Sequence, residues 1–430
     1  MKRRKILILM VFIITIFSVF LIANSVYKRE IGYINERYSD NIKISSNSWD
    51  AEITRDVGKN PYSVSVGDIN NDGYNDIVVS NCGDNNVSIF IWNSSLNTWN
   101  TELKMNVGLA PWRLHLGDAN NDGYNDIATA NSDSDDVSII LWNYSINDWE
   151  KEQRITVGKG PEDVFLGDVD NDGDNDIVTA DVSDDNISIV LWNETYETWD
   201  PYFQLNVNDD PNSIYVGDVN ADGDNDIVVS NPQSDDISII IWNDSEETWN
   251  SERNINVGNG PNSVFIGDAN NDGKNDIVAT NMIRRNEIAI LIWNNSKTDW
   301  NSVIKRKVGD WPYSIFIEDV NNDGYNDIAT ANYGLDNNSV SLLYWNNETK
   351  DWNDQIRIPV GDDPTCVFIA DANNDGYNDI ITANSGDYAI SILLWNSDDT
   401  TTQVPGFEIL ITLISIIALL TLQKRKILNK

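Results

Sequence analysis

Histidine and cysteine are almost missing from this chain, which has one His and two Cys among 430 residues. This scarcity argues against His-dependent catalysis, a zinc site and a disulfide framework. Basic residues are also few, since 29 Lys and Arg stand against 68 Asp and Glu and give a formal net charge of -39. A field of that sign repels phosphates, so nucleic-acid binding is excluded.

Apolar residues are not scarce. The chain is 41% hydrophobic and 10% aromatic, with 16 Trp. This composition supports a packed core and excludes a disordered acidic tract. The length predicts either two or three domains or one large repetitive domain.

Long apolar runs occur only at the two ends. The first covers residues 6–23 and follows basic residues 2–5. A basic flank before an apolar stretch is typical of a secretory signal, and this stretch is also just long enough to span a bilayer. We therefore expect residues 1–25 to be a signal peptide or signal anchor, followed by a linker over residues 26–48.

The second run covers residues 409–422 and precedes the basic residues 424–426. With both basic clusters on the cytoplasmic side, the middle of the chain lies outside, membrane-anchored at the cell surface. Residues 399–407 are interpreted as a linker that ends in Pro-Gly-Phe, and residues 408–430 as a membrane anchor or sorting signal. The Pro-Gly-Phe motif, apolar stretch and basic tail resemble the PGF-type signals of archaeal surface proteins. That resemblance implies removal of the tail by an archaeosortase-type protease and attachment of a lipid anchor.

Between the ends, a pattern repeats seven times at intervals of 50 to 52 residues. Each copy has an acidic cluster flanked by short apolar runs that are bounded by Gly, Asp and Asn. This pattern predicts four β-strands per repeat and no helix outside the ends. Seven four-stranded units indicate an all-β fold, a seven-bladed β-propeller with apolar helices at both termini.

The ends of the repeat array predict how the ring closes. Residues 49–57 resemble an isolated fourth strand, and the seventh copy stops after Trp395-Asn396 without one. The N-terminal strand is therefore expected to complete the last blade, which hides both sheet edges. The propeller is predicted to span residues 49–398.

Every repeat carries the loop D-x-[ND]-x-D-G-x-x-D between its first and second strands. Oxygen side chains at alternating positions converge on a central ion when such a loop curls, and Gly permits the sharp turn. All-oxygen coordination with several carboxylates suits calcium. The predicted calcium ligands are Asp68, Asn70, Asp72, Asp76, Asp118, Asn120, Asp122, Asp126, Asp168, Asp170, Asp172, Asp176, Asp218, Asn220, Asp222, Asp226, Asp268, Asn270, Asp272, Asp276, Asp319, Asn321, Asp323, Asp327, Asp371, Asn373, Asp375 and Asp379.

These loops and the segments around them resemble the FG-GAP/VCBS-type repeat family, which is found in integrin alpha-chain propellers and in microbial surface proteins. The resemblance covers all seven repeats and implies structural calcium. The name-giving Phe-Gly and Gly-Ala-Pro segments are matched only loosely, by V-G-x-G-P and V-F-x-G-D. Glu318 and Ala370 also replace the Gly that precedes the first loop Asp elsewhere.

All but two Trp residues fall into two repeat positions on either side of a turn. One of them, such as Trp92, is expected to end the third strand, and the other, such as Trp99, to begin the fourth. Packing across the hairpin is favoured over sugar-stacking sites, because every blade repeats the pair. The turns carry Asn-Xaa-Ser/Thr sequons, which are glycosylation acceptors in an exported protein or simply good turn residues. The candidate acceptors are Asn93, Asn143, Asn193, Asn243, Asn294 and Asn347.

Strand order places the calcium loops and the Trp-flanked turns on one face. The opposite face carries the inter-blade loops and the turns between second and third strands, where the copies differ most. Binding residues concentrate on variable loops of a rigid scaffold, and aromatic residues and Arg are common anchors. The candidate ligand residues are Trp112, Arg113, Arg284, Arg285, Trp311, Tyr313, Tyr333 and Tyr388.

The single His and the two Cys also have predicted places in the blades. His115 occupies a position held by Phe or Tyr in other repeats, which favours a core role over a catalytic one. Cys82 and Cys366 belong to blades that become neighbours on closure. A disulfide between them is compatible with an extracytoplasmic compartment and depends on their geometry.

The favoured interpretation is a non-catalytic, calcium-stabilised surface module for adhesion or recognition of a protein or glycan. The alternative is an extracellular polysaccharide lyase or hydrolase on a propeller scaffold. Such an enzyme needs two carboxylates astride its substrate, and the acids that the sequence places belong to metal loops.

Overall fold

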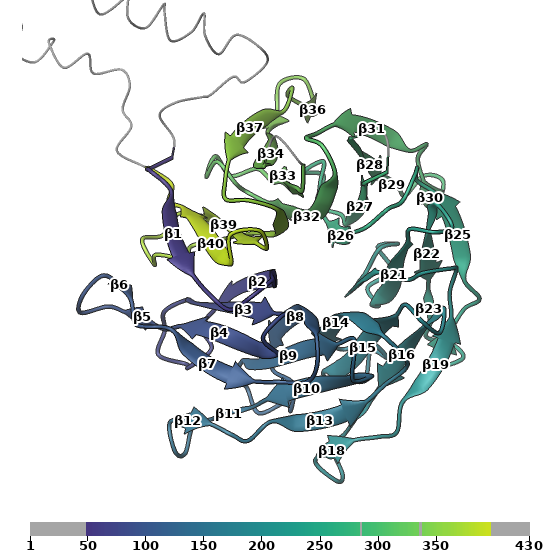
Figure 1. Ribbon diagram of the computed structural model, residues 1–430. Coiled ribbons are helices and arrows are strands. Elements are labelled where there is room, and N and C mark those ends of the chain that lie inside the picture. The colour runs from purple at the N-terminus through teal and green to yellow at the C-terminus, as the bar shows by residue number, and fades with distance from the viewer. Residues whose placement is uncertain (1–48, 284–285, 335–337, 397–430) are drawn as a thin grey trace, which may run out of the picture. The chain divides into compact units, whose positions relative to one another are not determined.

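The computed structural model describes residues 49–283, 286–334 and 338–396. Seven four-stranded antiparallel sheets form the blades of a ring (Figure 1). The prediction of an all-β, seven-bladed propeller is confirmed. The apolar segments 6–23 and 409–422 lie outside the described residues. In the described part of the chain, no helix has the length and apolar character needed to cross a membrane.

Each blade has an inner and a second strand joined by the acidic loop. The inner strands contact each other around the ring axis (Figure 1). They are β2 (Pro61–Gly67), β8 (Pro111–Gly117), β14 (Pro161–Gly167), β20 (Ser213–Gly217), β26 (Val264–Gly267), β32 (Pro312–Glu318) and β38 (Pro364–Ala370). The second strands are β3 (Asp76–Asn81), β9 (Asp126–Asn131), β15 (Asp176–Asp181), β21 (Asp226–Asn231), β27 (Asp276–Asn281), β33 (Asp327–Asn332) and β39 (Asp379–Asn384).

The third and outer strands complete each sheet. The third strands are β4 (Asn86–Phe90), β10 (Asp136–Ile140), β16 (Asn186–Val190), β22 (Asp236–Ile240), β28 (Glu287–Leu291), β34 (Ser339–Leu343) and β40 (Ala389–Leu393). The outer strands are β7 (Leu103–Asn106), β13 (Gln153–Thr156), β19 (Phe203–Asn206), β25 (Arg253–Asn256), β31 (Ile304–Lys307), β37 (Ile356–Pro359) and β1 (Ile53–Asp56).

The predicted strand boundaries are wrong at the Trp residues. We expected the third strand to end in Trp and the outer strand to begin with one. Instead, in six blades, the two Trp belong to a separate small hairpin. These hairpins are β5 (Trp92–Asn93) with β6 (Thr98–Trp99), β11 (Trp142–Asn143) with β12 (Asp148–Trp149), β17 (Trp192–Asn193) with β18 (Thr198–Trp199), β23 (Trp242–Asn243) with β24 (Thr248–Trp249), β29 (Trp293–Asn294) with β30 (Asp299–Trp300), and β35 (Trp345–Asn346) with β36 (Asp351–Trp352).

Ring closure follows the prediction. β1 pairs with β40, so the N-terminal strand forms the outer edge of the seventh blade. Trp49 and Trp395 form an isolated antiparallel bridge that replaces the small hairpin in this blade. Their rings meet edge to face, with centroids 5.0 Å apart. The first and last described segments of the chain therefore lie together on blade 7.

The hydrophobic core lies between neighbouring blades. One cluster contains Val64 and Val79 of blade 1 together with Ile381 and Ile390 of blade 7. The second and third strands are buried on both faces, which explains their nearly continuous Val, Ile and Ala content. Trp99 belongs to the same cluster and is 6% exposed. Trp92 and Trp99 meet edge to face across their hairpin, as favoured from the sequence, and they also pack between blades.

Aromatic side chains of the inner strands follow one another around the ring axis. His115 contacts Phe165 at a centroid distance of 4.4 Å, and contacts of 4.6 to 4.9 Å continue through four further rings. These rings belong to Tyr215, Phe265, Phe316 and Phe368. Burial lowers the pKa of His115 to about 4, so the imidazole is neutral at pH 7. The expected core role of His115 is confirmed.

Both cysteines are free thiols. The Cys366 Sγ atom lies 4.0 Å from the Ser63 hydroxyl and 3.7 Å from the Val64 carbonyl oxygen. Burial raises the pKa of Cys82 to about 11 and also raises that of Cys366. The disulfide considered from the sequence is not formed.

A buried polar network ends most second strands. Asn81 is fully buried, and its amide donates to the Ser88 hydroxyl at 2.8 Å; Ser88 donates in turn to Glu102 at 2.5 Å. Blade 3 has Asp181 at the Asn position. Its carboxylate accepts hydrogen bonds from the hydroxyls of Ser188, at 2.5 Å, and of Thr179, at 2.7 Å. Burial raises the pKa of Asp181 to about 7.

Asp181 should therefore make folding stability depend on pH. Between the ordinary carboxyl pKa near 4 and about 7, the folded chain holds a proton on Asp181 that the unfolded chain has released. This contribution is present at acid pH and is lost as pH rises toward about 7. We expect Asp181→Asn to abolish it, so that the difference in melting temperature between variant and wild type grows from pH 4 to 7 and is constant above. A pH-independent difference, measured in saturating calcium, would contradict this assignment.

Candidate functional site

The acidic loop between β2 and β3 turns tightly around the Asp68 carboxylate. Asp68 Oδ1 accepts from the backbone N–H of Asp72 at 3.0 Å, and Oδ2 accepts from that of Gly73 at 2.8 Å. Asn70 Oδ1 also accepts from the Asp72 N–H at 3.0 Å. Gly73 has a φ of 88°. This left-handed conformation explains the invariant Gly of the seven loops in this chain.

The last predicted ligand comes from the second strand rather than from the loop. Asp76 is fully buried, and its Oδ1 accepts from the Trp92 backbone N–H at 2.7 Å, which connects the loop to the small hairpin. Asp76 Oδ2 is buried without a hydrogen-bond partner, and the same atom is unpartnered in Asp276 and Asp327. An unpartnered buried carboxylate oxygen is costly unless a cation faces it.

The pKa of this carboxyl group is raised in all seven blades. Burial is the main cause, and the other loop carboxylates raise the pKa further. The pKa rises to about 7 for Asp76, Asp226, Asp276 and Asp379, and to about 8 for Asp126, Asp176 and Asp327. Each loop therefore gathers negative charge that a bound cation would compensate.

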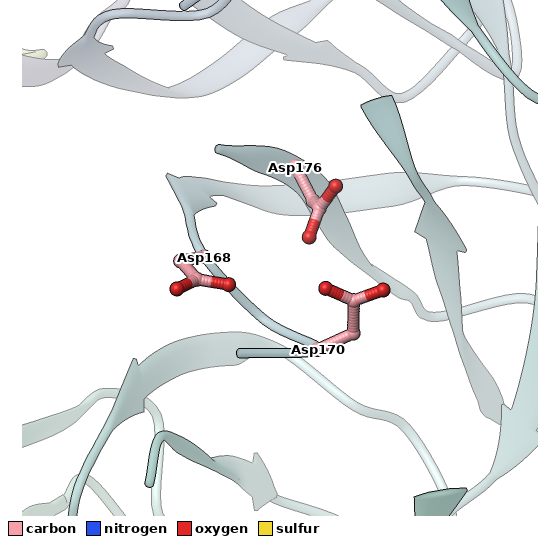
Figure 2. Close-up of side chains that lie close together, drawn as sticks. All are labelled: Asp168, Asp170 and Asp176. Carbon is pink, nitrogen blue, oxygen red and sulfur yellow. The ribbon is translucent and has the colours of Figure 1, made fainter. Parts of the chain in front are cut away.

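Blade 3 shows the convergence of the ligands most directly. Each of Asp168, Asp170 and Asp176 offers an oxygen, and these oxygens lie within 4.8 Å of one another. Their carboxyl groups converge in Figure 2. Asp168 Oδ1 is buried and has no hydrogen-bond partner. A set of oxygen ligands with several carboxylates fits a hard divalent cation such as calcium.

Two further asparagines of the repeat connect the loops of neighbouring blades. The Asn75 backbone N–H donates to Asn374 Oδ1 at 2.6 Å, and Asn374 Nδ2 donates back to the Asn75 carbonyl at 3.0 Å. Asn75 Nδ2 also donates to the carbonyl oxygen of Asp371, the first metal-loop residue of blade 7, at 2.9 Å. We call this set the inter-blade latch. Through the latch, the conformation of a metal loop and the contact between two neighbouring blades depend on the same hydrogen bonds.

The latch recurs around the ring and was not predicted. Reciprocal Asn pairs join blades 2 and 3, 3 and 4, 5 and 6, and 6 and 7. The signal in the sequence is the Asn before the last loop Asp, which is present in all seven copies. Because this Asn lies outside the alternating ligand positions, the metal pattern gave it no role.

Ala221 interrupts the latch between blades 4 and 5. It stands where the other six loops have Asn, with a φ of 58°. At this junction, Asn275 Nδ2 still donates to the Asp218 carbonyl at 3.0 Å, as in the latch of the other blades.

We expect Ala221→Asn to raise the free energy of unfolding by about 1 kcal/mol, because Asn adds the missing hydrogen bonds and tolerates a left-handed backbone. Asn171→Ala should lower the free energy of unfolding by a similar amount, because it removes the Asn pair between blades 3 and 4. Urea unfolding that shows no gain for Ala221→Asn would contradict the latch.

The face opposite the metal loops carries the inter-blade loops, and we call it the variable face. Arg113 of β8 reaches from blade 2 across the axis to three other blades. Its guanidinium donates to Asp163 Oδ2 at 2.9 Å, to the Asn212 carbonyl at 3.3 Å and to the Asn262 carbonyl at 3.2 Å. Burial alone would lower the pKa of Arg113, but the Asp163 carboxylate together with Tyr62 and Tyr313 outweighs burial, and the pKa is raised. Arg113, a predicted ligand residue, is committed to internal contacts.

Five aromatic rings on this face form a continuous series, which we call the aromatic track. Trp112 contacts Tyr62 at a centroid distance of 4.2 Å, and Tyr62 contacts Tyr313 at 5.6 Å. Tyr313 contacts Tyr333 at 5.6 Å, and Tyr333 lies nearly parallel to Trp311 at 6.5 Å. The structure thus brings together four predicted ligand residues. Tyr62 was missed, although it holds the same inner-strand position as Trp112 and Tyr313.

Polar groups lie beside the middle of the track. The Tyr62 and Tyr313 hydroxyls are hydrogen-bonded to each other, and the Asn212 amide donates to Glu162. Burial raises the pKa of Glu162 to about 7, while Arg113 opposes that shift. Tyr388 is 46% exposed in the turn of blade 7. The remaining predicted ligand residues, Arg284 and Arg285, lie outside the described residues.

The sequon asparagines have a structural role in the small hairpins. Asn93 Nδ2 donates to Asn100 at 2.9 Å, and its Oδ1 accepts from the Ser95 N–H at 3.1 Å. The residue seven positions further on is bonded in the same way by Asn143, Asn193, Asn243 and Asn294. In blade 6, Asn346 makes this contact instead, and the sequon residue Asn347 is exposed. The turn geometry explains why Asn recurs, and glycosylation stays a prediction.

The fold and loops together define a seven-bladed propeller with an oxygen-rich loop in every blade. The model of the FG-GAP-like repeat matches residues 68–129, 118–179, 168–229, 218–279, 268–330 and 319–382. These overlapping matches cover most of the chain, so the chain belongs to the FG-GAP-like repeat family. A search of curated proteins finds no match.

Solved structures show the same architecture at low sequence identity. Hydrazine synthase of Kuenenia stuttgartiensis is 14% identical and superposes with a TM-score of 0.56, over 84% of this chain and 100% of that chain. BBS1N, from a crystal of its complex with ARL6DN soaked with lead, is 12% identical with a TM-score of 0.55, over 82% and 98% of the two chains. At such identities these similarities concern the fold alone.

Proposed function

We propose that the protein is a calcium-stabilised binding or adhesion module of the cell surface, and that it is not an enzyme. The observation that carries this proposal is that the two faces of the propeller differ in chemistry. One face holds seven oxygen-rich loops, and the other gathers the aromatic track. The FG-GAP-like propeller is consistent with such a module. The ligand class at this level is a surface protein or a glycan.

The acidic groups favour binding over catalysis. The loop carboxylates are committed to loop hydrogen bonds, and Asp163 is paired with Arg113. Glu162 lies close to Tyr62 and Tyr313, and its carboxylate accepts a hydrogen bond from the Asn212 amide. Each of these acidic groups thus has a partner within the protein, and none of them requires a substrate to explain its position. The polysaccharide-active alternative therefore draws no support from them.

We further propose that both ends anchor the protein through blade 7. Trp49 and Trp395 are bridged, and the Asp50 N–H donates to the Leu394 carbonyl at 3.0 Å. The N-terminal signal anchor or signal peptide and the C-terminal anchor or PGF-type sorting signal thus attach to one point of the propeller. That point is on the loop side, so the variable face carries no tether.

Retention of the full-length protein on cell envelopes of its source tests this function. The protein, in mild detergent and saturating calcium, should bind envelopes depleted of the endogenous copy. Trp311→Asn should lose most of this retention, while Tyr196→Gln, on the loop side of blade 3, should keep it. Tyr196 is a suitable control because the residue is 75% exposed. Equal retention of both variants, or depolymerisation of an envelope polysaccharide by the protein, would overturn the proposal.

A further inference from the structure

Trp311 holds a backbone conformation that is unfavourable for its side chain. Its φ is 54°. All seven inter-blade loops have a left-handed residue at this position, but the other six use small or polar residues, namely Asn60, Ala110, Gly160, Asp210, Gly260 and Asp363. A left-handed conformation costs free energy for any side chain and is a genuine outlier for a bulky one. The fold therefore favours Gly or Asn where this chain has Trp.

Packing of the Trp311 side chain offsets the strain of its backbone only in part. The residue is 45% exposed, and its ring lies against Tyr333 at a centroid distance of 6.5 Å. Its backbone N–H reaches Asn286 Oδ1 at 3.5 Å, whereas the equivalent contact from Gly160 to Asp135 is 3.0 Å. An exposed Trp kept in a strained conformation is the kind of feature that ligand binding explains and folding does not.

The chemistry along the track fits a saccharide. The track runs inward from the exposed ring of Trp311 through Tyr333, with the hydroxyls of Tyr62 and Tyr313 at its middle and the carboxyl group of Glu162 close to them. Sugar rings present apolar C–H faces that stack on aromatic rings, and hydroxyls that bond to carboxyl and amide groups. The combination of stacking faces and hydrogen-bonding groups therefore suits a glycan.

The surrounding charge selects among glycans. Asp310 precedes Trp311, and Asp210 adds to the negative potential at Glu162. The chain as a whole carries -39. Such a field repels uronate, sulfate and phosphate polymers and leaves the binding of an uncharged sugar unaffected. We propose that the aromatic track binds a neutral glycan, with Trp311 as the outer stacking residue; this inference rests on the proposed binding function and deepens it.

Affinity electrophoresis with purified polysaccharides tests this inference. The full-length protein in mild detergent and calcium is run through gels that contain dextran, mannan or galactan as neutral glycans, or alginate as a polyuronate. We expect retardation in at least one neutral glycan and none in alginate. Trp311→Asn should weaken the retained interaction about tenfold, as expected for the loss of one stacked ring. The melting temperature of this variant should equal or exceed that of the wild type, because Asn relieves the backbone.

The outcomes separate the glycan inference from the proposed function. Retardation by a neutral glycan that is weakened in Trp311→Asn and kept in Tyr196→Gln supports the inference. If Trp311-dependent retention on envelopes persists but neutral glycans neither retard the protein nor compete, the ligand is a protein and the inference is wrong while the function stands. Retardation only in alginate, or equal retardation of Trp311→Asn and wild type, also overturns it.

Discussion

Removing calcium with a chelator is expected to lower the melting temperature of the protein by more than about 20 °C. Seven loops gather carboxylates, and three of them leave a buried Asp oxygen of the second strand without a partner. An ion that binds only the folded chain adds about 2.7 kcal/mol per site at a hundredfold excess over its dissociation constant. Because the latch connects each loop to the next blade, loss of the ions should weaken the whole ring.

Differential scanning fluorimetry with and without chelator measures this shift. Re-addition of calcium should restore the melting temperature, and equimolar magnesium should restore less, because magnesium demands a more regular shell with more water. The stabilisation should shrink as pH falls through about 7, since protons then compete for Asp76 and its equivalents. A melting curve that is the same in chelator and in calcium would refute the metal assignment.

Replacing Arg113 by Ala is expected to cost about 3–5 kcal/mol of folding free energy. The substitution leaves the Asp163 carboxylate buried without its cation, and removes donors from the Asn212 and Asn262 carbonyls. The side chains of Arg113 and Asp163 are 13% and 11% exposed, so water cannot replace the lost partner fully. Arg113→Lys should recover only part of the loss, because an ammonium group cannot reach the same fork of acceptors.

Urea unfolding in saturating calcium provides the measurement for Arg113. Lys159→Ala is the matched control, because Lys159 forms a surface ion pair with Asp184 in which the Lys side chain is 69% exposed. Exposed pairs contribute about 0–1 kcal/mol, so this variant should unfold close to the wild type. If Arg113→Ala is as stable as Lys159→Ala, Arg113 does not brace the blades.

The fold was predictable because it is periodic. Seven copies of one strand pattern specify the blade, and the isolated strand at residues 49–57 specifies the closure of the ring. The metal loops were predictable because alternating oxygen side chains and a Gly are local in sequence. The small hairpins were missed because Trp92 and Trp99 have high strand propensity, and only the main-chain pairing shows that their strands are separate from the blade.

The contacts between blades were not predictable from one repeat at a time. The latch joins Asn75 to Asn374, which are about as far apart in sequence as the propeller allows. The series from Trp112 through Tyr62 to Tyr313 likewise depends on ring closure and on which inner-strand residues meet at the axis. Arg113 was interpreted as a ligand residue because exposure cannot be inferred from residue type.

The number of calcium ions bound per folded chain is the most direct test of the central claim, that the acidic loops are metal sites which stabilise the propeller. The full-length protein is equilibrated with calcium, freed of unbound ion by gel filtration, and analysed for calcium and protein by elemental mass spectrometry. Our account predicts about seven ions per chain, one for each loop of the D-x-[ND]-x-D-G-x-x-D pattern. Less than one ion per folded chain would contradict it.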